Sequence, residues 1–148
     1  MGMTGIDFTQ INLHHSKGAS AVLARRLSAM HTAISLIQEP WLVRGGIRGL
    51  AGCGKLHKAP GEVKPRACVA IKGINAELLP AFCSRDVVAA EIRSIDEGGG
   101  VRRIVVCSVY FDGMGTLPPH PMEDLVRYCQ EEHLSLIVGC DSNAHHTV

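Results

Sequence analysis

The chain has 148 residues, of which 46% are hydrophobic and 20% are charged. This length suits one domain with its own core and is too short for two, and the composition excludes a disordered segment. No apolar run approaches the roughly 20 residues that a membrane-spanning helix needs, and the first ten residues lack the basic and apolar regions of a secretory signal. We therefore expect one intracellular domain, residues 1–148, that does not enter a membrane.

The cysteines are widely spaced and include no C-x-x-C pair. Structural zinc sites usually take two ligands from such a tight local spacing, so a zinc site is not expected. Cys107 and Cys140 fall within apolar, strand-like runs, where a free thiol packs as a small hydrophobic group. The pattern favours reduced cysteines in the core and no disulfide-linked partner. The six positions are Cys53, Cys68, Cys83, Cys107, Cys129 and Cys140.

Charge is unevenly distributed along the chain. Residues 40–76 contain seven basic residues and one acid, a net charge of +6, whereas residues 77–148 contain eleven acids and five bases, a net charge of −6. A basic, glycine-rich stretch can follow a nucleic-acid backbone. The same charges also keep an ordinary surface loop solvated, and charge alone slightly favours that interpretation.

The first part of the chain predicts a strand, a helix and a second strand. Phe8–Leu13 is a short β-prone run, Ser16 can cap a helix that ends near His31, and Ala33–Ile37 is an apolar strand that Pro40 terminates. This order usually means a crossover within one sheet.

The middle of the chain predicts loops and then strands. Residues 41–65 contain six glycines without a sustained period, which indicates loop with one short strand near residues 49–56. Ala67–Lys72 reads as a strand. Val87–Ile95 and Val101–Tyr110 are rich in valine and isoleucine, and the turn residues 96–100 between them predict an antiparallel hairpin.

The last part predicts a helix and a buried strand. Pro121 suits a first helical position, and Met122, Leu125, Val126 and Cys129 recur at helical spacing. Residues 134–138 form a continuous apolar strand. Hairpin strands combined with covering helices favour an α/β fold in which sheets pack together with helices outside.

Four apolar strands each end in a polar side chain. Asn12 ends the first, Glu39 follows the second, Tyr110 ends a later one, and Asp141 and Asn143 follow the last. Side chains two apart in an extended chain face the same side, and active sites of α/β domains form at strand ends. A carboxylate can activate water, an amide can donate to a phosphate oxygen, and one or two carboxylates suffice for Mg²⁺. Asp141-x-Asn143 alone is more typical of a polar turn, but repetition at four strand ends favours a metal and phosphate site.

These residues resemble the endonuclease/exonuclease/phosphatase superfamily, whose strand-end motifs carry an Asn, a Gln-Glu, a Tyr and an Asp-x-Asn in that order. More narrowly, three runs resemble the endonuclease domain of non-LTR retrotransposons. Repair-type relatives usually have Thr where Pro40 stands and Gly where Cys140 stands. The runs are Asn12-Leu13-His14-His15-Ser16, Gln38-Glu39-Pro40-Trp41 and Cys140-Asp141-Ser142-Asn143-Ala144-His145-His146.

The resemblance implies a metal-dependent phosphodiesterase that nicks DNA, built on a four-layered α/β/β/α sandwich and located in the nucleus. It implies that Glu39 ligates magnesium with Asn12 near the same shell, that Tyr110 contacts the phosphate, that Asp141 activates or positions water, and that Asn143 steadies the pentacoordinate phosphate. The basic segment then becomes a DNA-facing region. The DNA-binding residues expected on this basis are Arg44, Arg48, Lys55, Lys58, His145 and His146.

The resembling family continues past Asp-x-Asn with further strands, a helix and a last motif with an Asp and a catalytic His, and none of these precedes Val148. His145 and His146 are not expected to replace that histidine, because the retroelement branch has histidines there beside its catalytic one. We therefore expect a domain without its C-terminal portion, weakly stable and catalytically poor alone, with an exposed sheet edge. Two alternatives stay open: a decayed non-catalytic fragment, and a superfamily member acting in DNA repair or on lipid or inositol phosphates.

Overall fold

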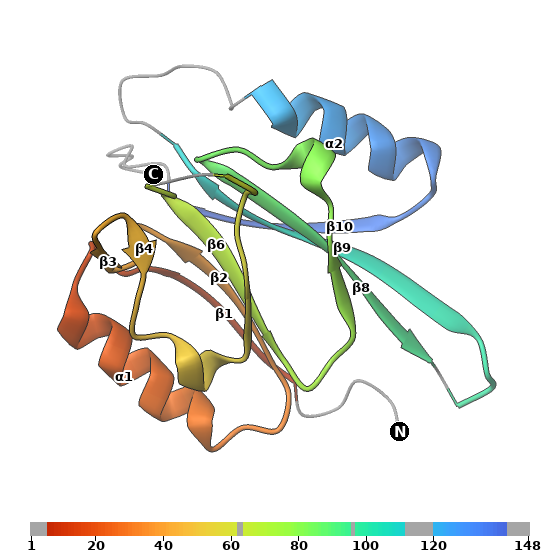
Figure 1. Ribbon diagram of the computed structural model, residues 1–148. Helices are drawn as coiled ribbons and strands as arrows, with labels where there is room; N and C mark the ends of the chain where they lie inside the picture. The colour runs from red at the N-terminus through yellow and green to blue at the C-terminus, as the bar shows by residue number, and fades with distance from the viewer. Residues whose placement is uncertain (1–5, 62–63, 96, 112–119, 142–148) are drawn as a thin grey trace, which may run out of the picture.

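The computed structural model describes residues 6–61, 64–95, 97–111 and 120–141, which form a mixed α/β fold (Figure 1). One four-stranded sheet has the order β1-β2-β6-β5 and a second has the order β10-β9-β8-β7. The first comprises β1 (Asp7–Asn12), β2 (Ala33–Gln38), β5 (Lys55–His57) and β6 (Ala67–Lys72). The second comprises β7 (Ala76–Leu78), β8 (Val87–Ile95), β9 (Val101–Tyr110) and β10 (Ser135–Asp141).

Each sheet contains one parallel pair joined through a helix. Helix α1 (Lys17–Ser28) connects β1 to the parallel β2, and helix α2 (His120–Glu131) connects β9 to the parallel β10. The strand–helix–strand prediction for the first part and the helix–strand prediction for the last part are thereby confirmed. Figure 1 shows the two helices on opposite outer sides of the sheets.

Helix α1 begins as its sequence predicts and ends earlier. The Ser16 hydroxyl accepts a 3.0 Å hydrogen bond from the N–H of Ala19, the expected cap. The helix ends at Ser28 and not near His31. Lys72 Nζ, from β6, donates to the carbonyl oxygens of Leu27 (2.9 Å) and Ser28 (3.2 Å), so a distant residue satisfies two of the last carbonyls.

Three clusters of buried apolar side chains pack these elements together. One lies between α1 and the first sheet and contains Leu23 and Leu27, and a second joins the inner faces of the two sheets. A third packs α2, through Leu125 and Cys129, against the second sheet. The predicted mixed α/β class therefore agrees with the structure. Within the described residues, no helix is long and apolar enough to cross a membrane.

Several short elements differ from the prediction. Residues 41–57 form the hairpin of β3 (Leu42–Val43) and β4 (Gly46–Ile47), a 3₁₀ turn (Ala51–Cys53) and β5, and not a single strand near 49–56. Strand β7 and a second 3₁₀ turn (Pro80–Phe82) were not predicted. The β8–β9 hairpin is confirmed, with Val87 opposite Val109 and Ile95 opposite Val101.

Cys107 is buried as expected, but Cys140 is exposed. The core position expected for Cys140 is wrong because β10 lies at the edge of its sheet. Ile137 and Val138 on the same strand are each 40% exposed. A continuous apolar run thus does not identify a strand that is covered on both faces.

Candidate active site

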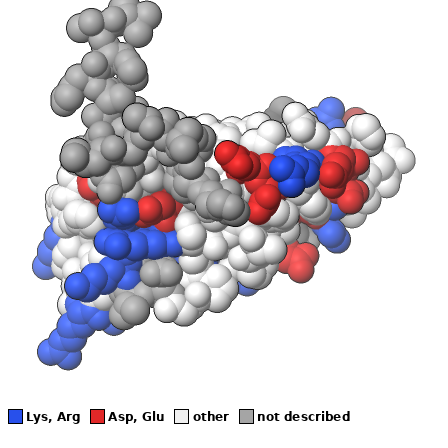
Figure 2. All heavy atoms as spheres, turned by 90° about the horizontal axis from the view of Figure 1, so that it is seen from above, with Lys and Arg blue, Asp and Glu red and all other residues white. Residues whose placement is uncertain are grey.

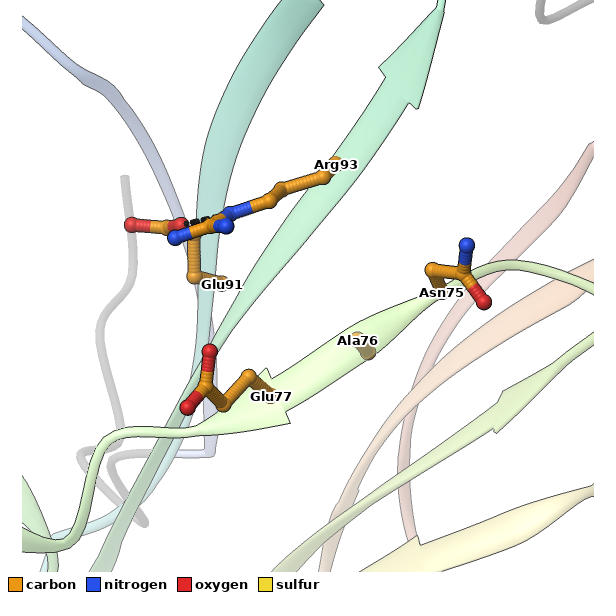
Figure 3. A pocket seen from close by; sticks show the side chains of 5 residues that line it. All are labelled: Asn75, Ala76, Glu77, Glu91 and Arg93. Carbon is orange, nitrogen blue, oxygen red and sulfur yellow. Dashed lines mark hydrogen bonds and ion pairs between the residues drawn. The ribbon is translucent and has the colours of Figure 1, made fainter.

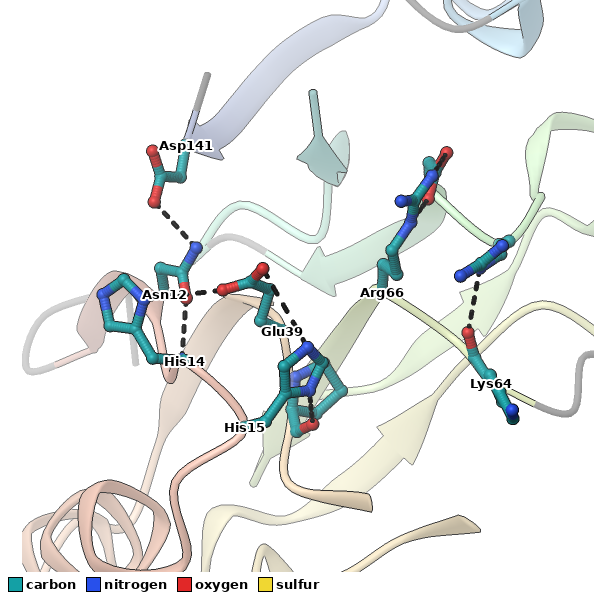
Figure 4. Close-up of polar contacts among 10 residues, drawn as sticks. Asn12, His14, His15, Glu39, Lys64, Arg66 and Asp141 are labelled. Carbon is teal, nitrogen blue, oxygen red and sulfur yellow. Dashed lines mark hydrogen bonds and ion pairs between the residues drawn. The ribbon is translucent and has the colours of Figure 1, made fainter. Parts of the chain in front are cut away.

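The polar residues at the strand ends gather at one end of the two sheets. Asn12 and Asp141 end β1 and β10, Glu39 follows β2, and Tyr110 ends β9. Because β1 runs parallel to β2, and β10 parallel to β9, each pair of strands finishes side by side. Asn12 Nδ2 donates a 2.7 Å hydrogen bond to Asp141 Oδ2, so side chains 129 positions apart join the two sheets here (Figure 4).

Two histidines surround the Glu39 carboxylate, which is 18% exposed. His14 Nδ1 lies 3.5 Å from one carboxylate oxygen, and His15 Nε2 lies 3.9 Å from the other. The opposite ring nitrogen of His15 donates to the carbonyl of Pro40 at 2.9 Å, which fixes the ring (Figure 4). The side-chain oxygen of Asn12 accepts a 2.7 Å hydrogen bond from the N–H of His14. The loop after β1 therefore wraps around the residue that follows β2.

The backbone is strained at these three positions. Glu39, His14 and His15 have φ angles of 48°, 50° and 55°, in the left-handed region that residues with side chains rarely adopt. Two backbone hydrogen bonds of 2.8 Å hold Glu39: its N–H donates to the carbonyl of Arg66, and its carbonyl accepts from the N–H of His15. Such strain persists only where surrounding contacts over-determine the conformation, and it clusters at functional sites.

A buried polar link ties the sheets together beneath the strand ends. Gln38 is fully buried, and its Nε2 donates to Ser108 Oγ at 3.0 Å and to the carbonyl of Gly139 at 3.3 Å. Its Oε1 accepts from Gln10 at 2.6 Å, while Ser108 donates to the carbonyl of Ile37 at 2.7 Å. A Cβ on Gly139 would lie 2.8 Å from Gln10 Cγ, so this close approach requires glycine. These bonds fix the strand ends relative to one another.

Tyr110 is held by a charged pair that the sequence did not suggest. The guanidinium of Arg66 lies over the Tyr110 ring, 4.8 Å from its centroid. It also makes two hydrogen bonds to the Asp86 carboxylate, at 2.5 and 2.7 Å. In the sequence, Arg66 is only one of the seven basic residues within residues 40–76. The usable signal was that Arg66 and Asp86, with opposite charges, each stand directly before a buried strand.

Four of the expected DNA-binding residues lie on or beside the β3–β4 hairpin and β5. Arg44, Arg48, Lys55 and Lys58 are all exposed, with Arg44 in the turn of the β3–β4 hairpin. Lys55 and Lys58 line a groove of 440 Å³ together with Glu77 of β7. Figure 2, seen from above, shows basic side chains gathered on one side of this face and mixed charges on the other. Asn143, His145 and His146 lie outside the described residues.

A separate pocket of 280 Å³ lies against β7 and β8 and is lined by Asn75, Glu77, Glu91 and Arg93 among others (Figure 3). Glu91 is 3% exposed, and its carboxylate accepts from Arg103 at 2.8 Å and from Arg93 at 2.7 Å. The hydrogen bond from Arg103, followed by that from Arg93, outweighs burial and lowers the pKa of Glu91. Two arginines thus donate hydrogen bonds to this carboxylate, and we interpret the three residues as a structural ion-pair cluster.

The fold has a solved counterpart in the endonuclease domain of TRAS1, a telomere-specific non-LTR retrotransposon, with a TM-score of 0.66. The chain has the fold of a retrotransposon endonuclease domain. The match covers 93% of this chain at 24% identity, a level that establishes the fold alone, and the chain spans 58% of that domain. No model of a known protein family and no curated protein matches the sequence. The resemblance expected from the strand-end motifs is confirmed by this structural likeness.

Proposed function

We propose that the chain is a metal-dependent phosphodiesterase domain that nicks DNA, built on the α/β/β/α sandwich of the endonuclease/exonuclease/phosphatase type. The observation that carries this proposal is the hydrogen bond between Asn12 and Asp141, with Glu39 beside it, at the meeting point of the two sheets. The likeness to the TRAS1 endonuclease domain supports the same direction. DNA as substrate implies a nuclear location.

The oxygen atoms at this site suit Mg²⁺. Glu39 would ligate the ion with Asn12 close to the same shell, and Asp141 adds a second carboxylate. No group of three or more His, Cys, Asp or Glu among the described residues is arranged to hold a metal. This fits magnesium, which keeps several waters and binds through one or two carboxylates plus the substrate's phosphate. When bound, the ion would supply Lewis acidity at the phosphate.

The chain's own residues then divide the work of hydrolysis. Asp141 positions the attacking water and takes its proton as the oxygen adds to phosphorus. The bond to the leaving oxygen then breaks, and the departing alkoxide takes a proton from solvent water. Asn12 orients Asp141 through their 2.7 Å hydrogen bond. Tyr110 contacts the phosphate, and Asn143 steadies the charge that develops on it. Arg44 and Arg48 would contact the DNA backbone near the site, as would Lys55, Lys58, His145 and His146.

The test is conversion of supercoiled plasmid to nicked circles. We expect slow nicking by this chain that needs Mg²⁺, stops with EDTA, and falls about 100-fold or more in Glu39→Gln. The matched control is Glu131→Gln, an exposed carboxylate at the end of α2, which should nick like the wild type. Nicking that is unaffected by EDTA or by Glu39→Gln would overturn the proposal. Fast nicking would overturn only the expectation of poor activity.

Metal binding gives a second readout that does not need turnover. Mn²⁺ is a spectroscopic substitute for Mg²⁺, and its binding can be followed by water-proton relaxation. Glu39→Gln should weaken binding about tenfold or more, because it removes a ligating carboxylate, and Glu131→Gln should leave it unchanged. Undetectable metal binding together with absent nicking would favour the decayed, non-catalytic alternative.

A further inference from the structure

Arg66 and Asp86 occupy equivalent places in the two sheets. Arg66 directly precedes β6 and Asp86 directly precedes β8. The N–H of Arg66 donates to the carbonyl of Arg85 at 2.8 Å, while the carbonyl of Arg66 accepts from the N–H of Glu39 at 2.8 Å. The main chain of Arg66 is therefore bonded on one side to the segment that leads into β8 and on the other to the residue proposed to ligate the metal.

The side chains of this pair form a forked, partly buried ion pair. Arg66 Nε and Nη2 each donate to a different oxygen of Asp86, at 2.5 and 2.7 Å. The two side chains are only 23% and 22% exposed. A bidentate fork fixes the plane of the guanidinium as well as its position. Arg66 is thus a rigid support for whatever lies against it.

What lies against it is the ring of Tyr110. The Arg66 guanidinium carbon is 4.8 Å from the ring centroid, a cation–π contact. Asp86 also holds the tyrosine, because its carbonyl accepts the N–H of Tyr110 at 2.8 Å. Tyr110 stands beside Asp141 in the parallel β9–β10 register. Paired residues of neighbouring strands share a face of the sheet, so the tyrosine faces the same side as the carboxylate that reaches Asn12.

We infer that Arg66 and Asp86 are positioning residues that hold the Tyr110 ring in place for contact with the scissile phosphate. This inference rests on the proposed phosphodiesterase function for its purpose, but the contact itself can be tested without catalysis. The two hydrogen bonds to Asp86 fix the Arg66 guanidinium, and the guanidinium holds the Tyr110 ring. The orientation of the ring in turn sets the direction of the tyrosine hydroxyl.

The direct test uses ring-labelled tyrosine in the full chain, which contains only two tyrosines. Tyr128 packs against Phe82 with ring centroids 5.1 Å apart and provides an internal reference. Arg66→Met keeps a long apolar side chain but removes the guanidinium. We expect the NMR signals of the Tyr110 ring to shift toward those of a freely rotating tyrosine, while those of Tyr128 stay in place.

A matched control removes an equivalent fork elsewhere. Arg103 of β9 makes two hydrogen bonds to the Glu91 carboxylate of β8, at 2.8 and 3.3 Å, and it lies earlier on the strand that ends at Tyr110. Arg103→Met should leave the Tyr110 signals unchanged. Unchanged Tyr110 signals in a folded Arg66→Met variant would overturn the inference. If Arg66→Met does not fold, Asp86→Asn, which weakens the fork with little change of shape, should give a smaller shift in the same direction, and no shift would again overturn it.

The kinetic test asks whether Arg66 acts through Tyr110. Arg66→Met should lower kcat of plasmid nicking about tenfold with KM changed less than about threefold, because ground-state DNA contacts persist. Arg66→Lys should recover only part of the loss, since lysine cannot form the fork. In a Tyr110→Phe background, Arg66→Met should have little further effect. Full additivity of the two losses would overturn the inference. Absence of metal-dependent nicking in the wild type counts against the proposed function, and the ring spectra then decide the inference alone.

Discussion

The buried link between the sheets makes a sharp prediction, because two fully buried serines, Ser108 and Ser35, have opposite surroundings. Ser108 makes two hydrogen bonds, to the carbonyl of Ile37 and from Gln38. Among the described residues, Ser35 Oγ has no hydrogen-bond partner. At about 1 kcal/mol for each bond, Ser108→Ala should lower the free energy of unfolding by about 2 kcal/mol. Ser35→Ala removes a buried hydroxyl without a partner and should be neutral or stabilise by up to about 1 kcal/mol.

Each variant lacks one buried hydroxyl oxygen. Comparing their urea unfolding therefore isolates the contribution of the hydrogen bonds to stability. We expect the urea midpoint to be highest or unchanged for Ser35→Ala, intermediate for the wild type and lowest for Ser108→Ala. The melting temperature of Ser108→Ala should be about 4–8 °C lower than that of the wild type. Equal destabilisation of both variants would refute the reasoning, because the loss would then come from packing. Ser108→Ala should also slow nicking, since Gln38 directly precedes Glu39.

Two further predictions concern glycine and histidine. Gly73 has φ +74° and a Cβ there would collide with the carbonyl oxygen of His31, so Gly73→Ala should cost about 3 kcal/mol or more in urea unfolding. Gly61 has φ +76° but no described heavy atom within 4 Å of such a Cβ, and Gly61→Ala should cost only about 1–2 kcal/mol; equal costs would contradict this. Burial and then the charge of Lys55 lower the pKa of His57 below its ordinary 6.5. As the pH falls below 6.5, the unfolded state binds a proton at His57 more readily than the folded state does, so stability is full above pH 6.5 and falls as the pH drops. His57→Gln should reduce that loss of stability at low pH. An unchanged pH dependence of the unfolding free energy would contradict this.

Local sequence signals predicted the longer elements of this fold. The Ser16 cap, the helical spacing of Met122, Leu125 and Cys129, and the valine-rich pair on either side of residues 96–100 are all short-range patterns, and the structure contains the elements they indicate. These elements bury their apolar residues in the clusters that hold the domain together. Local preference and tertiary packing therefore agree wherever an element is long.

Elements of two or three residues could not be predicted in the same way. Strands β3, β4 and β7 are too short to show a period, and their pairing depends on partners elsewhere in the chain. The exposure of Cys140 depends on the place of β10 at the sheet edge, which strand order decides and local sequence does not. These features are properties of the topology.

The sequence singled out candidate site residues that the structure brings together, but it did not indicate the contacts between them. Strand ends located Asn12, Glu39, Tyr110 and Asp141, because polar residues after apolar strands stand out from the sequence. No local pattern indicated that Asn12 bonds to Asp141 across 129 positions, since that contact depends on how the two sheets are packed. The same holds for the fork that supports Tyr110.

The strained backbone of Glu39 depends on contacts with residues that are distant in the sequence. A glutamate with φ of 48° costs energy that a glycine at this position would avoid, yet glycine has no carboxylate to offer. The conformation is held from both sides, by the carbonyl of Arg66 from one and by the N–H of His15 from the other. Arg66 is also the residue that holds the ring of Tyr110. One residue therefore constrains both the carboxylate proposed to bind the metal and the phenol proposed to bind the phosphate, and displacing its backbone would disturb the two together.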